Sequence, residues 1–223
     1  EFSSKLGLPQ MTACTTVNEP SSTPCFATVY ATGTQPSVPD TSTTAGLVAL
    51  REHAVDIEMA HAMAPKASIV MVEAPTFGLF DTPSIFSAVQ CASQIVTAMG
   101  GGLISNSWGT AKTKDDVHEY PGEISDDAYF KTQGIVYTTS SGDTLAPSNY
   151  PSSSPNVVSV GGTAFVRDKK GDFVKEVAWI NDIGGGSSGG PSVYEPRYPF
   201  QNTVMKVVGT ARGTPDIAAI ASN

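Results

Sequence analysis

Two carboxylates within an apolar stretch carry the first chemistry that this sequence suggests. Glu52 and Asp56 lie between Ala45 and Met63, a segment whose pattern predicts a helix that ends before Pro65. Residues four apart share a helix face, with their Cβ atoms about 5–6 Å apart. Because like charges at that spacing repel, one carboxyl is expected to keep its proton to higher pH, and the pair to titrate as a unit.

Such a pair can act as a general base in acid, where a histidine would be protonated and unable to accept a proton. The same face carries apolar residues, namely Ala49, Met59, Ala60 and Met63. Largely apolar surroundings are therefore expected, and burial there would penalise both charges. The alternative is an ordinary acidic helix face, which the spacing alone does not exclude.

Two further groups follow predicted buried strands, where active groups collect in parallel sheets. Trp108-Gly109 closes the group Ser105-Asn106-Ser107-Trp108-Gly109 and could let a peptide run beside the backbone. A core tryptophan followed by a turn glycine is the alternative. Asp143, in Ser140-Ser141-Gly142-Asp143-Thr144, could stabilise an oxyanion if it is protonated. An aspartate that caps a helix or a turn is the alternative there.

The elements that must position these residues alternate along the chain. Strands are expected at 26–31, 68–74, 103–108 and 135–140, and helices at 45–63, 84–99 and 123–132. This order predicts an α/β fold with a parallel sheet and right-handed crossovers. A strand at 156–160 and a hairpin at 164–179, turning at Lys170-Gly171, should follow. Residues 1–25 are expected to be irregular, and residues 1–223 to form one domain.

Composition limits the partners. The chain has 223 residues, of which 40 % are hydrophobic, and a formal net charge of −8. That length and apolar content favour a packed domain. The negative charge argues against nucleic acid or an anionic membrane as partner, and no apolar run is long enough to span a bilayer.

The three cysteines bear on the compartment. Cys14 and Cys25 lie in a stretch rich in Ser, Thr and Pro, and we interpret them as a disulfide worth about 2–3 kcal/mol. Two unpaired surface thiols are the alternative. Cys91, in an apolar helical run, is expected to be a buried free thiol. No zinc-type spacing is present. A disulfide indicates an oxidising compartment, so the protein is expected to be secreted and extracellular.

Taken in order, the motifs of the chain resemble those of the sedolisins, the serine-carboxyl peptidases with a subtilisin-like fold. The matching series is Glu52-x-x-x-Asp56-Ile57-Glu58, Ala60-His61-Ala62-x-Ala64-Pro65, Ile69-Val70-x-Val72-Glu73-Ala74, Ser107-Trp108-Gly109, Ser141-Gly142-Asp143, Tyr150-Pro151-Ser152-Ser153-Ser154-Pro155, Val158-x-x-Val160-Gly161-Gly162-Thr163 and Arg212-Gly213-Thr214-Pro215-Asp216. The resemblance runs from about Phe2 to the last residue. It implies a mainly parallel sheet with helices on both faces, and peptides or proteins as substrates.

The resemblance also implies roles for single residues. Glu52 matches the family's general base, Asp56 its carboxylate partner and Asp143 its oxyanion-hole aspartate. The segment Ser107–Gly109 matches the strand that pairs with the substrate backbone, and Ser141 and Gly142 line the same cleft. The implied reaction is acyl transfer from a peptide bond to a serine, followed by hydrolysis, at acidic pH.

One part of the family pattern is not found. The nucleophile belongs to a Gly-Thr-Ser motif beyond the Pro-Asp element, and that motif does not occur in residues 1–223. The family's calcium site also lies near its C-terminus, so no metal or other cofactor is expected within this chain. A strand should also precede Phe2. We therefore expect a domain truncated at both ends, inactive alone, with the remaining segments of its own domain as a further partner.

Other functions have less support in the sequence. Gly185-Gly186-Ser187-Ser188-Gly189 matches G-x-S-x-G, but it lacks the preceding buried strand and following helix that a nucleophile elbow needs. No His-Gly-Thr-His element supports a histidine-based subtilisin, so His61 is expected to be packed or partly exposed helix surface. A non-catalytic peptide-binding or interaction module with the same fold is the second hypothesis.

Overall fold

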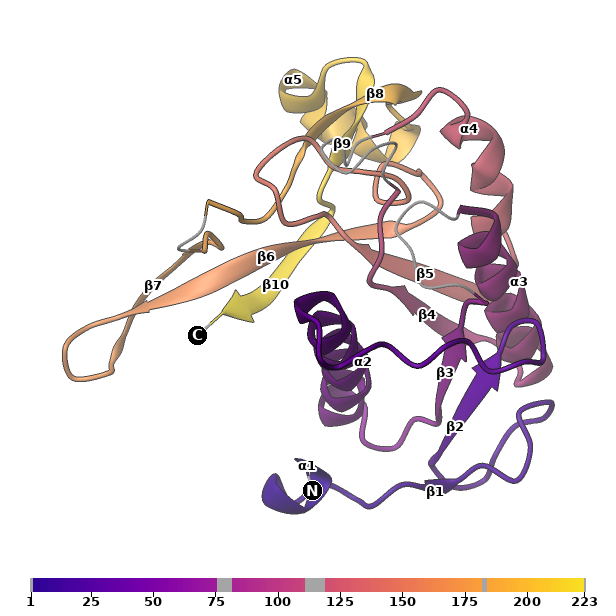
Figure 1. Cartoon of the computed structure of the whole chain (residues 1–223). Helices are drawn as coiled ribbons and strands as arrows, with labels where there is room; N and C mark the ends of the chain where they lie inside the picture. The colour runs from indigo at the N-terminus through magenta and orange to yellow at the C-terminus, as the bar shows by residue number, and fades with distance from the viewer. Residues whose placement is uncertain (1, 76–81, 111–118, 182–183, 223) are drawn as a thin grey trace. The chain divides into compact units, whose positions relative to one another are not determined.

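The computed structural model describes residues 2–75, 82–110, 119–181 and 184–222 (Figure 1). The chain divides into two compact units. The first holds residues 1–107 and 132–135, and the second holds residues 108–131 and 136–223. The expectation of one domain over residues 1–223 stays a prediction.

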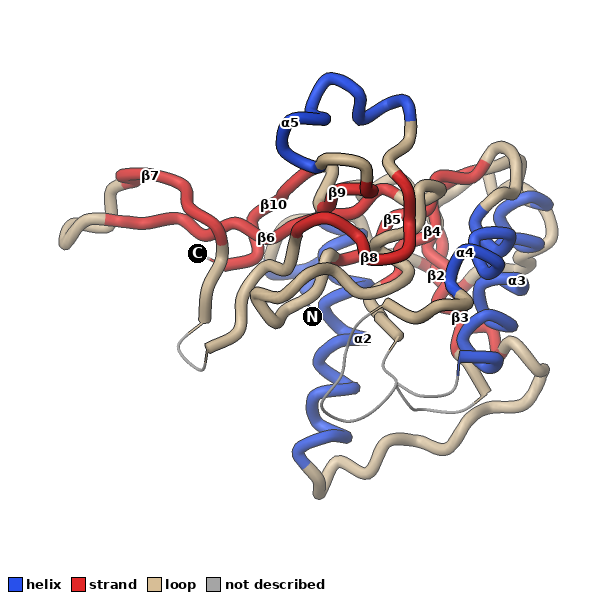
Figure 2. The backbone as a smooth tube through the Cα atoms, turned by 90° about the horizontal axis from the view of Figure 1, so that it is seen from above, coloured by secondary structure: helices blue, strands red, loops and turns tan. Residues whose placement is uncertain are grey.

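A three-stranded parallel sheet organises the first unit. Its strands are β1 (Thr12–Ala13), β2 (Cys25–Tyr30) and β3 (Ile69–Glu73), paired in that order. Strand β3 lies between α2 (Thr44–Met63) and α3 (Thr82–Ala98), as Figures 1 and 2 both show, and it contacts both helices. The expected parallel sheet with helices on both sides is confirmed here. The unit also contains α1 (Phe2–Lys5) and β4 (Gly102–Asn106), which contacts α3.

Helix α2 is anchored at both ends. The Thr43 hydroxyl accepts a hydrogen bond of 3.1 Å from the backbone N–H of Gly46, which caps the helix start. Position 46 must be glycine because a Cβ atom there would lie 2.1 Å from the Asp40 carbonyl oxygen. Near the other end, buried His61 places its Nε2 atom 2.8 Å from the Pro9 carbonyl oxygen. His61 is thus a packing residue, as expected.

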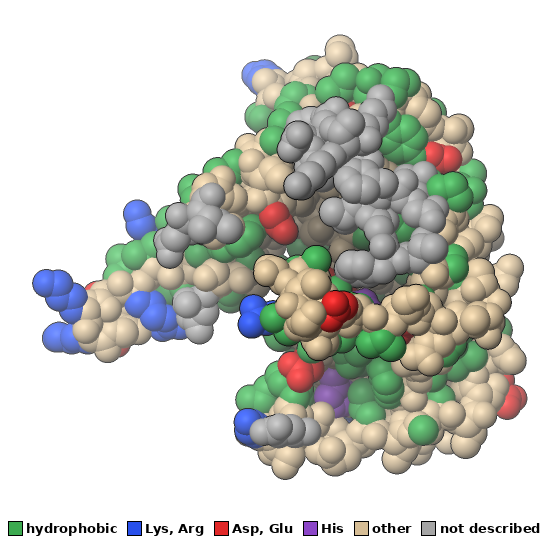
Figure 3. All heavy atoms as spheres, viewed as in Figure 1, with side chains coloured by type: hydrophobic (Ala, Val, Ile, Leu, Met, Phe, Trp, Pro, Cys, Tyr) green, Lys and Arg blue, Asp and Glu red, His purple; other side chains and the backbone are tan. Residues whose placement is uncertain are grey.

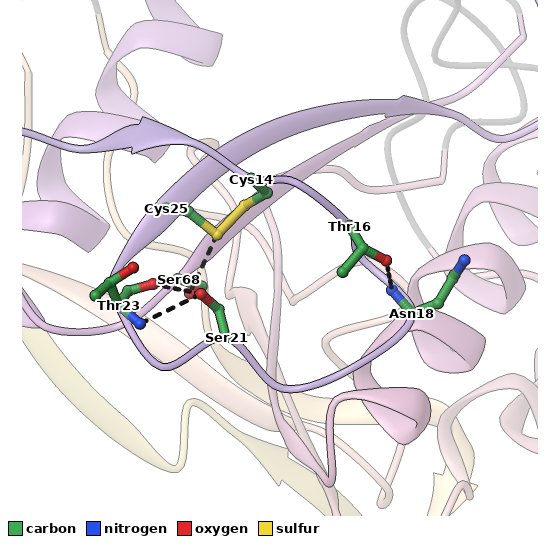
Figure 4. Close-up of a disulfide and its surroundings, with 7 residues drawn as sticks. All are labelled: Cys14, Thr16, Asn18, Ser21, Thr23, Cys25 and Ser68. Carbon is green, nitrogen blue, oxygen red and sulfur yellow. Dashed lines mark hydrogen bonds between the residues drawn. A yellow bond between two sulfur atoms is a disulfide. The ribbon is translucent and has the colours of Figure 1, made fainter.

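The predicted disulfide is present. Cys14 and Cys25 are joined beside the start of β2, with Ser68 next to them (Figure 4). Cys91 is free and half-buried within α3, and partial burial raises the pKa of its thiol.

A second, mainly parallel sheet organises the second unit. Strand β6 (Val158–Arg167) pairs in parallel with β5 (Ile135–Ser140) and with β10 (Ile217–Ser222), and antiparallel with β7 (Phe173–Ala178). The β6–β7 hairpin extends away from the rest of the unit (Figures 1 and 2). Lys and Arg side chains gather toward its end (Figure 3), where the sequence carries Arg167, Lys169, Lys170 and Lys175.

Aromatic side chains form a buried cluster in this unit. The Phe130 ring lies 5.5 Å from Tyr137 and 6.0 Å from Tyr150, measured between ring centroids, and all three residues are buried. The unit also contains the short elements α4 (Glu123–Asp126), the 3-10 helices η1 (Asp127–Phe130) and η2 (Pro199–Val204), α5 (Met205–Val208), and the antiparallel pair β8 (Gly190–Pro196) and β9 (Ala211–Thr214).

Several local predictions were wrong. The strand expected at 156–160 and the first strand of the hairpin are one continuous strand, β6. The helix expected at 123–132 is a short α-helix followed by a 3-10 turn that ends at Phe130. The strands expected to be fully buried are less enclosed, since Leu103 in β4 is exposed and β3 is half-buried throughout. Residues 1–25, which were expected to be irregular, contain α1 and β1.

None of the described helices is long and apolar enough to cross a bilayer.

Candidate active site

Helix α2 presents the carboxylate pair one turn apart. Glu52 is exposed and Asp56 is half-buried. The apolar enclosure expected around them is not formed by the described residues, because Met59 is 51 % exposed and Met63 is 83 % exposed. The expectation that burial penalises both charges is therefore wrong for Glu52.

Asp56 is fixed by a residue far away in sequence. Ser107, directly after β4, donates a hydrogen bond of 2.6 Å from its Oγ atom to Asp56 Oδ1. Hydroxyl–carboxylate bonds of about 2.5–2.7 Å are charge-assisted. Of the residues proposed for catalysis or substrate binding, the first unit thus brings Ser107 into contact with Asp56.

In the second unit, Ser141, Gly142 and Asp143 follow β5, and a glycine-rich loop holds them. The Ser141 N–H donates to the Val160 carbonyl at 2.8 Å. From the loop 184–190, the Ser188 N–H donates to the Gly142 carbonyl at 2.9 Å, and the Gly186 N–H donates to the backbone carbonyl of Asp143 at 2.8 Å. The sequence showed this loop as glycine-rich but gave no signal of its contact with Ser141–Asp143.

Asp143 has an exposed side chain, yet nearby protein atoms partly desolvate its carboxyl and raise its pKa. A carboxyl with a raised pKa stays protonated further into mild acid, and a protonated carboxyl can donate a hydrogen bond. This is the property that an oxyanion-stabilising aspartate needs.

Asn149 is a residue that the sequence analysis missed. Its side chain is buried against Gly109, where a Cβ atom would lie 1.8 Å from Asn149 Nδ2. A Cβ atom at Gly142 would lie 3.8 Å from Asn149 Oδ1. The side chain therefore joins two segments that had been assigned to substrate binding, and only glycine fits at position 109 beside it. Trp108, the neighbour of Gly109, has its ring centroid 6.4 Å from that of Phe130.

Ser187 occupies a structural position. Its Oγ atom accepts a hydrogen bond of 2.9 Å from the Gly162 N–H and lies 3.4 Å from Ser141 Oγ. The residue lies in a loop, without the strand and helix that frame a nucleophile elbow. The rejection of Gly185–Gly189 as a hydrolase motif agrees with this position.

The predicted site residues thus fall into two sets. Glu52, Asp56 and Ser107 belong to the first unit, and Trp108, Gly109, Ser141, Gly142 and Asp143 belong to the second. Across the described ranges, no group of three or more His, Cys, Asp or Glu side chains is arranged to hold a metal ion.

Comparisons with known proteins bear on the family. No curated protein matches the chain. Among solved structures, the chain is similar to Pseudomonas sedolisin, a serine-carboxyl proteinase complexed with two molecules of pseudo-iodotyrostatin. The two share 22 % identity with a TM-score of 0.69, and the match covers 99 % of this chain and 60 % of that one. The model of the subtilase family (Peptidase_S8) matches residues 41–223. The chain therefore has a subtilisin-like α/β fold and belongs to the subtilase family.

Proposed function

We propose that this chain is the larger part of an acid-acting endopeptidase domain of the serine-carboxyl type, with peptides or proteins as substrates. The observation that carries the proposal is the pair Glu52 and Asp56, one turn apart on α2, inside the residues matched to the subtilase family. Buried His61 on the same helix already contacts the Pro9 carbonyl, which favours a carboxylate rather than that histidine as the base.

In the proposed reaction, Glu52 accepts the proton of a serine hydroxyl as that oxygen attacks the scissile carbonyl carbon. Asp56 shares the negative charge of Glu52 and holds its orientation. Protonated Asp143 donates a hydrogen bond to the oxyanion that forms on the carbonyl oxygen. Glu52 then returns the proton to the leaving amine, and water hydrolyses the acyl-enzyme by the reverse sequence.

The nucleophilic serine is proposed to come from outside residues 1–223, because the Gly-Thr-Ser motif of the resembling family does not occur in them. Residues 1–223 alone are therefore proposed to be inactive. Secretion is proposed from the Cys14–Cys25 disulfide, a bond that persists in oxidising compartments.

The test uses the full-length protein that contains these residues. Glu52→Gln keeps the shape of the side chain and removes its basicity, so kcat toward a peptide at about pH 4 should fall about 100-fold or more. Glu176→Gln, an exposed glutamate on β7, is the matched control and should retain full activity. Undiminished cleavage by Glu52→Gln would refute the assignment of the base. A full-length protein that binds peptides without cleaving them would favour the non-catalytic module.

A further inference from the structure

The contact between Ser107 and Asp56 gives Ser107 a role other than the one expected from its place in the sequence. As part of Ser107–Gly109, it was assigned to the segment that pairs with the substrate backbone. Its side chain instead donates to Asp56 Oδ1 at 2.6 Å. The backbone of this segment and the hydroxyl of Ser107 can therefore serve two different purposes.

The hydrogen bond has a physical consequence for the acid pair. It orients the Asp56 carboxylate, because Oδ1 is held toward the end of β4 and Oδ2 is left for other partners. Asp56 is only half-buried, so burial alone does not fix its side chain.

We propose that Ser107 is a positioning residue of the acid pair, whose hydroxyl orients the Asp56 carboxylate beside Glu52. The proposal rests on the proposed function, since the pair must be the general base for this to affect catalysis. Ser107 acts through Asp56 and does not itself take or give a proton.

Three variants of the full-length protein separate this role from others. Ser107→Ala removes the hydroxyl, Ser107→Thr keeps it, and Ser105→Ala removes an exposed hydroxyl two residues earlier on β4. For Ser107→Ala we expect kcat to fall about 3- to 10-fold, the size of one hydrogen bond, with KM within about twofold.

Ser107→Thr should restore kcat, and Ser105→Ala should leave it unchanged. If Ser107→Ala raises KM and keeps kcat, the hydroxyl binds substrate and the proposal is wrong. If Ser107→Ala lowers the melting temperature but keeps kcat of the folded enzyme, the role is structural and the proposal is also wrong.

A measurement without turnover distinguishes failure of this proposal from failure of the proposed function. The carboxyl carbon of Asp56, labelled with ¹³C and assigned through Asp56→Asn, is observed by NMR at one pH in the wild type and in Ser107→Ala. Loss of the hydrogen bond should change its chemical shift. If the chemical shift changes while Glu52→Gln remains active, the contact is as described and the base is wrongly assigned. If the chemical shift does not change, Ser107 does not orient Asp56 and the proposal fails.

Discussion

Ser153 donates a hydrogen bond of 2.8 Å from its Oγ atom to Glu123 Oε1, and both side chains are fully buried in the second unit. The Tyr120 N–H donates to the other oxygen, Glu123 Oε2, at 2.9 Å. These two bonds favour the ionised carboxylate, but burial outweighs them and raises the pKa of Glu123 to about 8. Nearby Glu119 and Glu195 raise it further by repulsion.

Stability should therefore fall as the medium becomes neutral. Burial also raises the pKa of Glu195, to about 7, while the ordinary value for both groups is 4.5. Because the folded state holds these protons more tightly than the unfolded chain, the stabilisation is complete below about pH 4.5. It is lost as the pH rises through about 7 to 8, and amounts to a few kcal/mol. Thermal melts between about pH 4 and pH 8 should show a steady decrease in melting temperature. A melting temperature that rises toward neutrality would contradict this.

Glu195→Gln should flatten that dependence. Neither carboxyl oxygen of buried Glu195 has a hydrogen-bond partner among the described residues. A neutral amide of the same shape cannot become charged there, so the variant should be more stable than wild type at about pH 8, by about 1–3 kcal/mol. Near pH 4 the two proteins should differ little. Glu176→Gln, on exposed β7, is the control and should follow the wild-type profile. Equal destabilisation of Glu195→Gln at every pH would show that its proton is not the cause.

Arg212→Met should destabilise the second unit by about 3 kcal/mol. Arg212 is fully buried, and its Nη1 atom lies 2.7 Å from Asp216 Oδ1. Asp216 Oδ2 also accepts from the Ser159 N–H at 2.9 Å, so the variant leaves a fixed carboxylate without its cation. Denaturant unfolding measures the loss. Arg212→Lys should recover only part of it, because an ammonium group cannot reach both carboxylate oxygens as a guanidinium does. Full recovery by lysine would show that charge alone matters.

Gly109→Ala should cost about 1–3 kcal/mol of stability through overpacking. The added methyl group would lie 1.8 Å from Asn149 Nδ2, so one of the two side chains must move. The double variant Gly109→Ala/Asn149→Ala provides room and should be more stable than the sum of the single variants predicts. Unfolding free energies of the three proteins test this, and strict additivity would mean that Asn149 does not limit position 109.

The sequence was enough to predict elements whose own pattern defines them. Helix α2 and strand β5 were expected at nearly their observed bounds because an apolar pattern and a clear stop such as Pro65 are local signals. Strand β6 was predicted as two elements, a strand at 156–160 and the start of a hairpin at 164, with Gly161 and Gly162 between them. In the structure these glycines are required by close packing, since a Cβ atom at Gly161 would lie 2.7 Å from Pro215 and one at Gly162 would lie 3.0 Å from Ala221.

The site was predictable to a similar degree. The spacing of Glu52 and Asp56 on one helix is local, but the contact between Ser107 and Asp56 spans 51 positions of the chain. The contact of Asn149 with Gly109 also joins residues far apart in the sequence. The buried glutamates Glu123 and Glu195 lie near each other only because α4 and β8 pack together. Exposure of the acid pair could not be predicted either, because the pattern of a helix gives its apolar face and not what covers it.

The most direct test of a carboxylate base is the pH dependence of kcat/KM for the full-length protein, measured with one peptide substrate from about pH 3 to about pH 8. The account predicts the highest value in acid, where a carboxylate base can still accept a proton and Asp143 is protonated. The value should then decrease toward neutrality as Asp143, whose pKa is raised by desolvation, loses its proton. A profile that rises through about pH 6.5 to a neutral plateau would indicate a histidine base and contradict the account.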